Sequence, residues 1–367
     1  MENTNRKMSQ FEILRVISML LIIMLHFLSH GGVNNELKIG TVDYMFFTVA
    51  RSFAYLGVNC FVLISGYFLC DKDFKSSRIF KIIIQVLFYS LLGSIIVALL
   101  TNKSLSLKEI LFTLFPLTGN KYWFASVYVV LLILSPVLNS AINKLNQKQH
   151  LTLVLSMVFA FSVIPTFLFW SRAVLSDGKD ITWFVTLYFI AAYLKKYPVH
   201  NTLKEIACAF SVCVLATPLA EMGIMGLLST MTSNLPDKVM FFNNQFFVMC
   251  GGVLLFLLIS NLPVGKVGNQ VAKLGNLTFG VYLFHDNDLV RTYLWNCVKA
   301  SRFLPNLLLE IVYMFFVVAC IFICGSMIEF ARKHLEKKLK IDRLAKNVDK
   351  KIEELISFIC DRQIDCF

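Results

Sequence analysis

Ten apolar runs divide this chain of 367 residues, and most are long enough to cross a hydrocarbon core about 30 Å thick. Backbone polar groups inside lipid must be hydrogen-bonded within the chain, so such runs fold as helices. The runs cover residues 13–29, 45–70, 79–100, 122–138, 151–170, 181–194, 206–219, 239–260, 274–289 and 304–330. The sequence therefore predicts an all-α polytopic membrane protein with about ten transmembrane helices.

The distribution of charge predicts how the helices are oriented. Only 16% of the residues are charged, whereas 57% are hydrophobic, as expected for a chain that lies in lipid. With the N-terminus placed inside, Lys and Arg gather in the inner connections and after residue 330, so both termini are expected in the cytoplasm and the protein in the cell membrane. Because these basic residues flank spans instead of forming one patch with aromatic residues, a nucleic-acid partner is disfavoured.

Two parts are expected, a membrane-embedded domain at residues 1–330 and a basic amphipathic cytoplasmic tail at residues 331–367. The tail mixes Lys and Glu with Leu and Ile at helical spacing, which fits either a solvated helix or one that binds anionic lipid or a partner. The first run lacks the small-residue exit of a cleavable signal peptide and is expected to stay in the membrane. The ten cysteines have no metal-ligand spacing, so no metal site is predicted.

The first run carries two side chains that are costly inside a membrane, Arg15 and His26. Their separation of eleven residues places them within roughly 20° of one helix face and about 16 Å apart along the axis. Glu12 lies three residues before Arg15, at the spacing of a helix-end ion pair. Arg15 and Glu12 therefore form either a snorkelling pair or part of a site, and His26 is either a packing residue or a proton acceptor.

The second run continues the polar pattern with Arg51, Tyr55 and Asn59, spaced four residues apart along a helix. Such a stripe faces protein or water rather than lipid, so it is either a helix–helix contact or the wall of a polar cavity shared with His26. Gly57 is expected to permit close approach of a neighbouring helix.

A basic loop follows the second run, with Lys75, Arg78 and Lys81 at a spacing of three. The positive-inside rule alone explains these charges. The alternative is a clamp for a polyanionic cytosolic ligand, such as the phosphates of coenzyme A.

Two constellations on the predicted outer side complete the candidates. One is GNKYWFASVY around Trp123, and the other is LFHDNDLVR, which places His285 and Asp286 at the end of the ninth run with Arg291 close behind. A His-Asp pair with an arginine can polarise a hydroxyl or hold a sugar, but it can also serve as an interface cap.

Taken in order, these residues resemble the acyltransferase-3 family of integral membrane O-acyltransferases. The resemblance covers residues 9–330 and is strongest with the branch that modifies bacterial surface polysaccharides. It rests on the Arg15-x10-His26 spacing, GVNCFVLISGYFL, the Lys75-x-x-Arg78 loop, KYWFASVYVVLLILSPVLN and TFGVYLFHDN. The family's loop is more often Arg-x-x-Arg, and Lys75 weakens bidentate phosphate recognition without removing the charge.

The resemblance implies an O-acetyltransferase that moves acetyl from cytosolic acetyl-CoA to a hydroxyl of a cell-surface polysaccharide or its lipid-linked precursor. It implies that His26 is catalytic, with Arg15 and its neighbour Glu12 as partners, and that the basic loop binds acyl-CoA. Arg51, Tyr55, Trp123, His285 and Asp286 are then candidates for acceptor binding. Direct attack on the thioester and an acyl-histidine intermediate both remain open.

A secondary transporter or flippase for a lipid-linked sugar or small anion is the alternative, because it also needs buried charge along a cavity. The sequence shows no paired broken helices in matching halves, which counts against this alternative.

Overall fold

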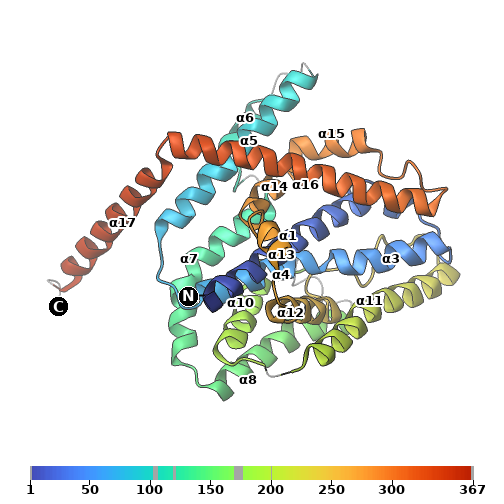
Figure 1. The fold of residues 1–367 in the computed structure, drawn as a ribbon, viewed down its shortest axis with the longest axis horizontal. Helices are drawn as coiled ribbons and strands as arrows, with labels where there is room; N and C mark the ends of the chain where they lie inside the picture. The colour runs from blue at the N-terminus through green and yellow to red at the C-terminus, as the bar shows by residue number, and fades with distance from the viewer. Residues whose placement is uncertain (1, 102–105, 119–120, 169–176, 200, 365–367) are drawn as a thin grey trace.

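The computed structural model describes residues 2–101, 106–118, 121–168, 177–199 and 201–364. Every regular element in these ranges is helical, which confirms the all-α prediction (Figure 1). The elements are α1 (Glu2–Ser29), α2 (Val33–Glu36), α3 (Val42–Ala54), α4 (Leu56–Leu69), α5 (Ser76–Thr101), α6 (Leu107–Leu114), α7 (Trp123–Lys144), α8 (Gln147–Val158), η1 (Phe159–Val163), α9 (Ile164–Phe167), α10 (Ile181–Lys196), α11 (Leu203–Met231), α12 (Phe246–Asn261), α13 (Lys266–Ala272), η3 (Gly275–Leu277), α14 (Thr278–His285), α15 (Asp288–Val298), α16 (Leu307–Lys338) and α17 (Ile341–Ile364).

Seven helical stretches of the described chain are long and apolar enough to cross a membrane, fewer than the ten runs of the sequence. They are Met8–Ser29, Val42–Leu69, Ser76–Thr101, Trp123–Lys144, Gln147–Phe167, Leu203–Met231 and Leu307–Lys338. Three further runs form shorter helices, because α10 and α12 have 16 residues each and α14 has eight. The run expected at 151–170 ends in residues that lie outside the described ranges. The polytopic membrane architecture is confirmed.

The long second run folds as two helices instead of one, with Tyr55 at the junction between α3 and α4. The expected close approach of a helix occurs at Gly57, where an added Cβ would lie 2.6 Å from the backbone oxygen of Ser18 on α1. Only glycine allows α4 to pack this tightly against α1. The contact fixes the position of α3, which carries Arg51, relative to the helix that carries His26.

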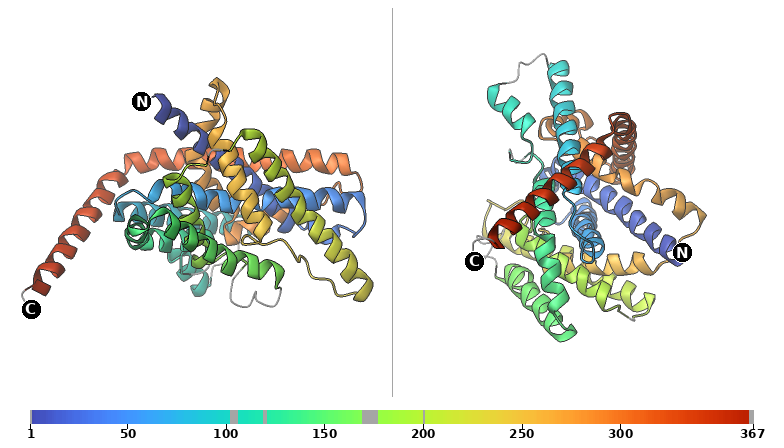
Figure 2. Two further views of the ribbon diagram at one scale, coloured as in Figure 1. Left: turned by 90° about the horizontal axis from the view of Figure 1, so that it is seen from below. Right: turned by 90° about the vertical axis from the view of Figure 1, so that its left-hand side faces the viewer.

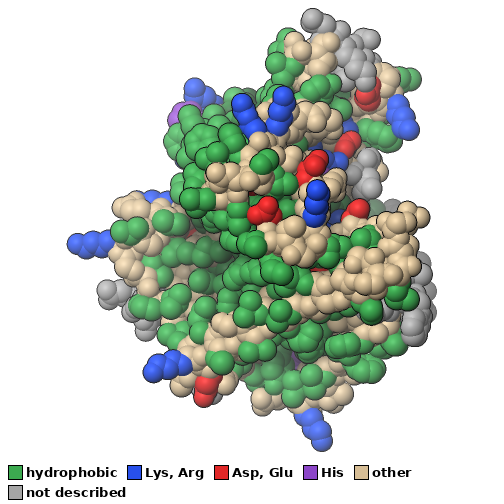
Figure 3. Space-filling view, turned by 90° about the vertical axis from the view of Figure 1, so that its right-hand side faces the viewer, with side chains coloured by type: hydrophobic (Ala, Val, Ile, Leu, Met, Phe, Trp, Pro, Cys, Tyr) green, Lys and Arg blue, Asp and Glu red, His purple; other side chains and the backbone are tan. Residues whose placement is uncertain are grey.

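Helices α1 and α4 form the centre of the bundle (Figure 1). α1 packs against α3, α12, α13 and α16, and α4 packs against α10 and α12. Large apolar side chains on the surrounding helices point outward, among them Leu99, Val137, Leu219, Phe316 and Met327. Apolar side chains also cover much of the end of the molecule in Figure 3. An exposed apolar surface of this extent is expected where lipid replaces water.

A buried charged cluster joins α16 to α5. Glu329 is fully buried and accepts hydrogen bonds from Arg332 at 2.8 Å, from the Tyr89 hydroxyl at 2.9 Å and from the Gln85 amide at 3.1 Å. An added Cβ on Gly280 of α14 would lie 2.3 Å from the Glu329 carboxylate. The cluster therefore fixes α5, α14 and α16 relative to one another. Helix α16 continues past residue 330 and so includes Arg332.

The C-terminal helix α17 packs against the first turns of α5 and then projects away from the bundle (Figures 1 and 2). Asp349 accepts hydrogen bonds at 2.6 Å from the Ser76 hydroxyl and from the Ser77 backbone N–H. Although partial burial opposes ionisation, these bonds hold the pKa of Asp349 below its usual value of 3.8. Asp342 forms an ion pair with Lys81, and the hydrogen bond from Lys81 lowers the pKa of Asp342.

We expect Asp349→Ala to release α17 from α5, because the substitution removes the acceptor for the Ser76 hydroxyl and the Ser77 backbone N–H at the start of α5. Hydrogen–deuterium exchange of residues 341–364 should become faster, and Glu353→Ala, which changes an exposed carboxylate on the same helix, should leave it unchanged. Since the pKa of Asp349 is depressed, the contact is present above pH 3.8 and is lost only as the pH falls below it. Unchanged exchange in Asp349→Ala would show that apolar packing alone holds α17.

Candidate active site

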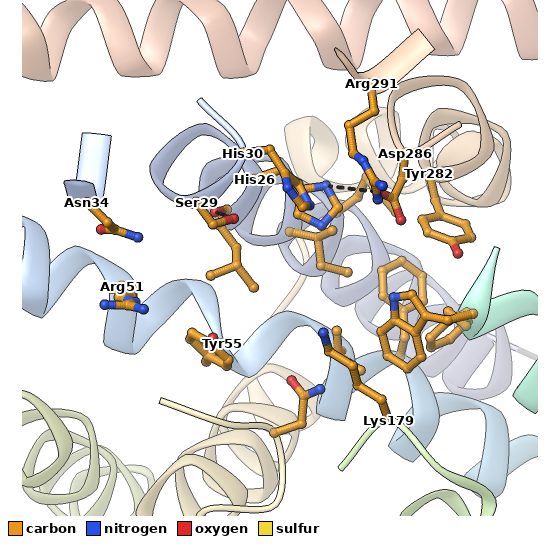
Figure 4. A pocket seen from close by; sticks show the side chains of 18 of the residues that line it. His26, Ser29, His30, Asn34, Arg51, Tyr55, Lys179, Tyr282, Asp286 and Arg291 are labelled. Atoms are coloured by element: carbon orange, nitrogen blue, oxygen red, sulfur yellow. Dashed lines mark hydrogen bonds and ion pairs between the residues drawn. The ribbon is translucent and has the colours of Figure 1, made fainter. Parts of the chain in front are cut away.

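A cavity of about 320 Å³ lies between α1, α3, α4 and α14 (Figure 4). Its lining includes His26 on α1, His30 directly after the end of α1, Arg51 on α3, Tyr55 at the α3–α4 junction, and Trp123 at the start of α7. Segments that precede α10 and α12 complete the wall with Lys179, Lys238 and Asn243. The cavity therefore collects polar side chains from six parts of the chain that are distant in sequence.

His26 and His285 are hydrogen-bonded to each other, with 3.1 Å between His26 Nδ1 and His285 Nε2. His285 Nδ1 lies 2.6 Å from the Val281 backbone oxygen, which can only accept, so Nδ1 of a neutral His285 carries the proton. His285 Nε2 then accepts the proton of His26 Nδ1. This assignment leaves His26 Nε2 as a basic lone pair, and no described residue bonds to it.

Asp286 provides the nearest negative charge to His26. Its Oδ1 lies 3.8 Å from His26 Nδ1 and 3.2 Å from Arg291 Nη1, and its side chain is only 3% exposed (Figure 4). Arg291 also pairs with Asp288 at 3.0 Å. An ionised carboxylate at this distance stabilises an imidazolium that forms at His26, and the charge of Arg291 favours the ionised form of Asp286, whereas burial opposes it.

His30 follows His26 by one helical turn, and their ring centroids lie 4.9 Å apart. Burial, followed by the charges of Arg291 and Lys179, lowers the pKa of His30 below its usual 6.5. His30 is therefore neutral at physiological pH and adds no positive charge beside His26.

His26, His30 and Asp286 also place three candidate ligand atoms within 4.8 Å of one another. A metal ion there would lie next to the guanidinium of Arg291, which already occupies the Asp286 carboxylate. Two His and one carboxylate are also a ligand set of catalytic zinc, so the argument against a metal ion here is the adjacent cation of Arg291, which fits a proton-transfer group better.

The remaining wall is aromatic and incompletely hydrogen-bonded. The Tyr55 ring stacks on Phe241 with centroids 5.6 Å apart. Three buried polar atoms of lining residues have no partner among the described residues, namely Arg51 Nε, the Tyr282 hydroxyl and Asn243 Oδ1. Less than 1 Å² of each atom is exposed, so these atoms become available to a ligand only when the lining side chains move.

Asn59, the third member of the expected polar stripe, supports the cavity without lining it. Its side-chain N–H donates to the Asn243 backbone oxygen at 2.8 Å, and its oxygen accepts from the Trp183 indole at 3.1 Å. Asn59 is fully buried and thereby fixes the segment that carries Asn243.

Arg15 and Glu12 lie near the middle of α1, and Arg15 is about three turns before His26. They form an ion pair with each other, and the Arg15 guanidinium lies 5.9 Å from the centre of the Phe68 ring. Their side chains are 27% and 20% exposed. At 1.5 Å per residue Arg15 is about 16 Å from His26 along the helix, so the two do not touch.

The basic loop precedes and begins α5, separate from the cavity. Lys81 is paired with Asp342 of α17, and Lys75 lies within electrostatic reach of Asp349. Among the described residues Arg78 has no ion pair. Asp342 and Asp349, which hold α17 against α5, therefore lie beside Lys81 and Lys75. These two lysines belong to the loop that is expected to bind a cytosolic anion.

Comparison with known proteins identifies the family. A family model described as an acyltransferase domain, acyltransferase 3, matches residues 8–326. The chain belongs to the acyltransferase 3 family. No curated protein and no solved structure shows a significant match to this acyltransferase 3 chain. Acyltransferase activity follows from the family, together with the need for an acyl donor.

The acyltransferase 3 match begins within α1, at residue 8, and extends beyond α14, so it includes every residue that lines the cavity. Sequence analysis did not single out His30, Lys179 or Tyr282. The four-residue spacing of His26 and His30 could have indicated His30, because both lie on one helix face. Lys179 and Tyr282 gave no comparable signal, since their place in the cavity depends on contacts between distant segments.

Proposed function

We propose that this acyltransferase transfers acetyl from cytosolic acetyl-CoA to a hydroxyl of a cell-surface polysaccharide or its lipid-linked precursor. The observation that carries the proposal is the free Nε2 of His26 beside a cavity with polar and aromatic walls. A base at this position can take a proton from a bound hydroxyl. Tyr55 and Trp123 offer flat apolar faces for a sugar ring, and the polar side chains of the cavity lining offer partners for its hydroxyls.

In the proposed reaction the acceptor oxygen attacks the thioester carbonyl carbon while its proton passes to His26 Nε2. The carbon–sulfur bond then breaks, and the coenzyme A thiolate receives the proton from His26. Asp286 stabilises the imidazolium during this step, and His285 holds the ring in the required tautomer. The Tyr282 hydroxyl is a candidate donor to the oxyanion.

The donor is proposed to enter from the cytosol, where Lys75, Arg78 and Lys81 would bind its phosphates. Arg15 and Glu12 would lie along the route between this loop and His26, because they precede His26 on α1, toward the end that is predicted to be cytoplasmic. Both termini are then cytoplasmic, as the distribution of Lys and Arg predicts.

Isolated membranes test the proposal with acetyl-CoA labelled in the acetyl group and polysaccharide from the native source. We expect alkali-labile label in the glycan and one free thiol released per acetyl transferred, with membranes that lack the protein as the control. Proton NMR of the glycan before and after mild alkali identifies the O-acetyl groups. Accumulation of glycan or anion inside sealed vesicles, without thiol release, would favour the transporter instead.

A further inference from the structure

The charges of the cavity lining are unbalanced. Four cationic side chains line it, from Arg51, Lys179, Lys238 and Arg291, against the carboxylates of Asp237 and Asp286. Lys238 pairs with Asp177 at 3.0 Å, and Arg291 pairs with Asp286 and Asp288. The described residues supply no ion-pair partner for the other two, Arg51 and Lys179.

Arg51 is bound to the protein only weakly. Its Nη1 donates to the backbone oxygen of Asp237 at 3.4 Å, and its guanidinium lies 4.6 Å from the centre of the Phe241 ring. Its Nε is buried without a partner in the described structure. A guanidinium held mainly by an aromatic face and one long hydrogen bond, with no carboxylate partner among the described residues, can bind a planar or tetrahedral anion through its terminal N–H groups.

Lys179 extends from the segment before α10 toward the same cavity. Figure 4 shows its side chain pointing up toward the space below His26 and His30, with Arg51 and Tyr55 to one side. Its Nζ lies 5.7 Å from the centre of the Trp123 ring. The two unpaired cations therefore border the space in which a hydroxyl would meet His26.

We propose that the acceptor carries an acidic group, a carboxylate or a phosphate, and that Arg51 and Lys179 bind it while His26 faces the reacting hydroxyl. The proposal rests on the proposed function for the identity of the acceptor. Arg51 is half-buried and Lys179 is exposed, so water can solvate both, but an acidic group in the cavity would give them the charged partner that the described residues do not supply. A neutral sugar would leave both of them without a charged partner.

Equilibrium binding without any acyl donor tests this inference, using the purified protein in lipid nanodiscs. The probes are methyl β-glucuronide, glucose 1-phosphate and neutral methyl β-glucoside, which bears a hydroxymethyl group where the glucuronide bears a carboxylate. We expect at least one anionic probe to bind about tenfold more tightly than the glucoside, with affinity that falls as salt rises. The preferred probe distinguishes a uronate from a sugar phosphate.

The variants Arg51→Gln and Lys179→Gln should each weaken binding of the anionic probe about tenfold and leave the glucoside unchanged. Lys266→Gln removes a cation outside the cavity and should change the affinity for neither the anionic probe nor the glucoside. Arg51→Lys, which keeps the charge, should retain part of the affinity and serves as a check on folding. An anionic probe that binds no better than the glucoside, including no binding by either, would overturn the inference.

Competition with coenzyme A separates this acceptor site from a donor site. If coenzyme A displaces the anionic probe and Arg51→Gln weakens coenzyme A binding equally, the cations belong to the donor and the inference is wrong. The binding measurements need no acyl transfer, so they would still show whether the cavity prefers an anionic sugar even if the proposed acetyltransferase function were wrong. Conversely, if the protein bound anionic and neutral probes equally, the inference of an acidic acceptor would be wrong, whereas the proposed acetyl transfer to a neutral glycan would not be contradicted.

Discussion

Replacing His26 with alanine is expected to lower the rate of acyl transfer by about 10²–10⁴-fold, the range usual for loss of a general base. The structure gives this residue the only free ring nitrogen of the His26–His285 pair, because the Val281 carbonyl fixes the tautomer of both rings. The rate is measured as labelled acetyl incorporated into glycan by membranes that contain equal amounts of inserted protein. His334→Ala is the matched control, since His334 is exposed on α16 and should leave the rate unchanged.

The pH dependence distinguishes a catalytic His26 from a structural one. If His26 takes the proton, wild-type transfer should lose activity as the pH falls and the imidazole becomes protonated, and the residual rate of His26→Ala should lack that limb. Acetyl retained on the wild-type protein after removal of the acceptor would instead support the acyl-histidine route. Full activity in His26→Ala would exclude both routes.

Replacing Arg332 with methionine is expected to destabilise the protein by about 3–5 kcal/mol, because Glu329 would remain as an uncompensated buried charge. Arg332 supplies two hydrogen bonds of 2.8 Å to that carboxylate, and the side chains of Glu329 and Arg332 are 1% and 7% exposed. Thermal unfolding of the purified protein in nanodiscs measures the change as a lower transition temperature.

The double variant Glu329→Met/Arg332→Met provides the control for that prediction. Removing both charges leaves no buried carboxylate at position 329, and Glu336, which loses its 2.9 Å ion pair with Arg332, is partly exposed, so we expect the double variant to recover much of the stability lost in Arg332→Met. A single variant as stable as the wild type would show that Tyr89 and Gln85 suffice to hold the carboxylate. A double variant less stable than the single one would show that the charges are needed for packing of α16 against α5.

The sequence predicted those parts of the molecule that depend on local pattern. Arg15 and His26 lie on one helix, Tyr55 and Arg51 line a common cavity with His26, and the apolar runs form helices. These results follow from periodicity and from the cost of polar groups in lipid. Periodicity did not reveal the junction at Tyr55, because no proline interrupts the run between α3 and α4.

Contacts between distant segments could not be predicted in the same way. His26 and His285 are 259 residues apart, and their hydrogen bond depends on how α14 packs against α1 and α16. Glu329 and Arg332 stand where the last apolar run seemed to end, so their burial depends on α5 and α14 reaching that point. A single sequence carries no direct signal for such pairings.

The single helix α1 carries both Arg15 and His26, and this makes its length as important as its composition. One residue inserted between them would turn His26 by about 100° relative to Arg15 and move it about 1.5 Å along the axis. Seven inserted residues would return it to nearly the same face but displace it by about 10.5 Å, well away from His285 on α14. α1 can therefore accept substitutions at its other positions more readily than any change in the number of residues between these two.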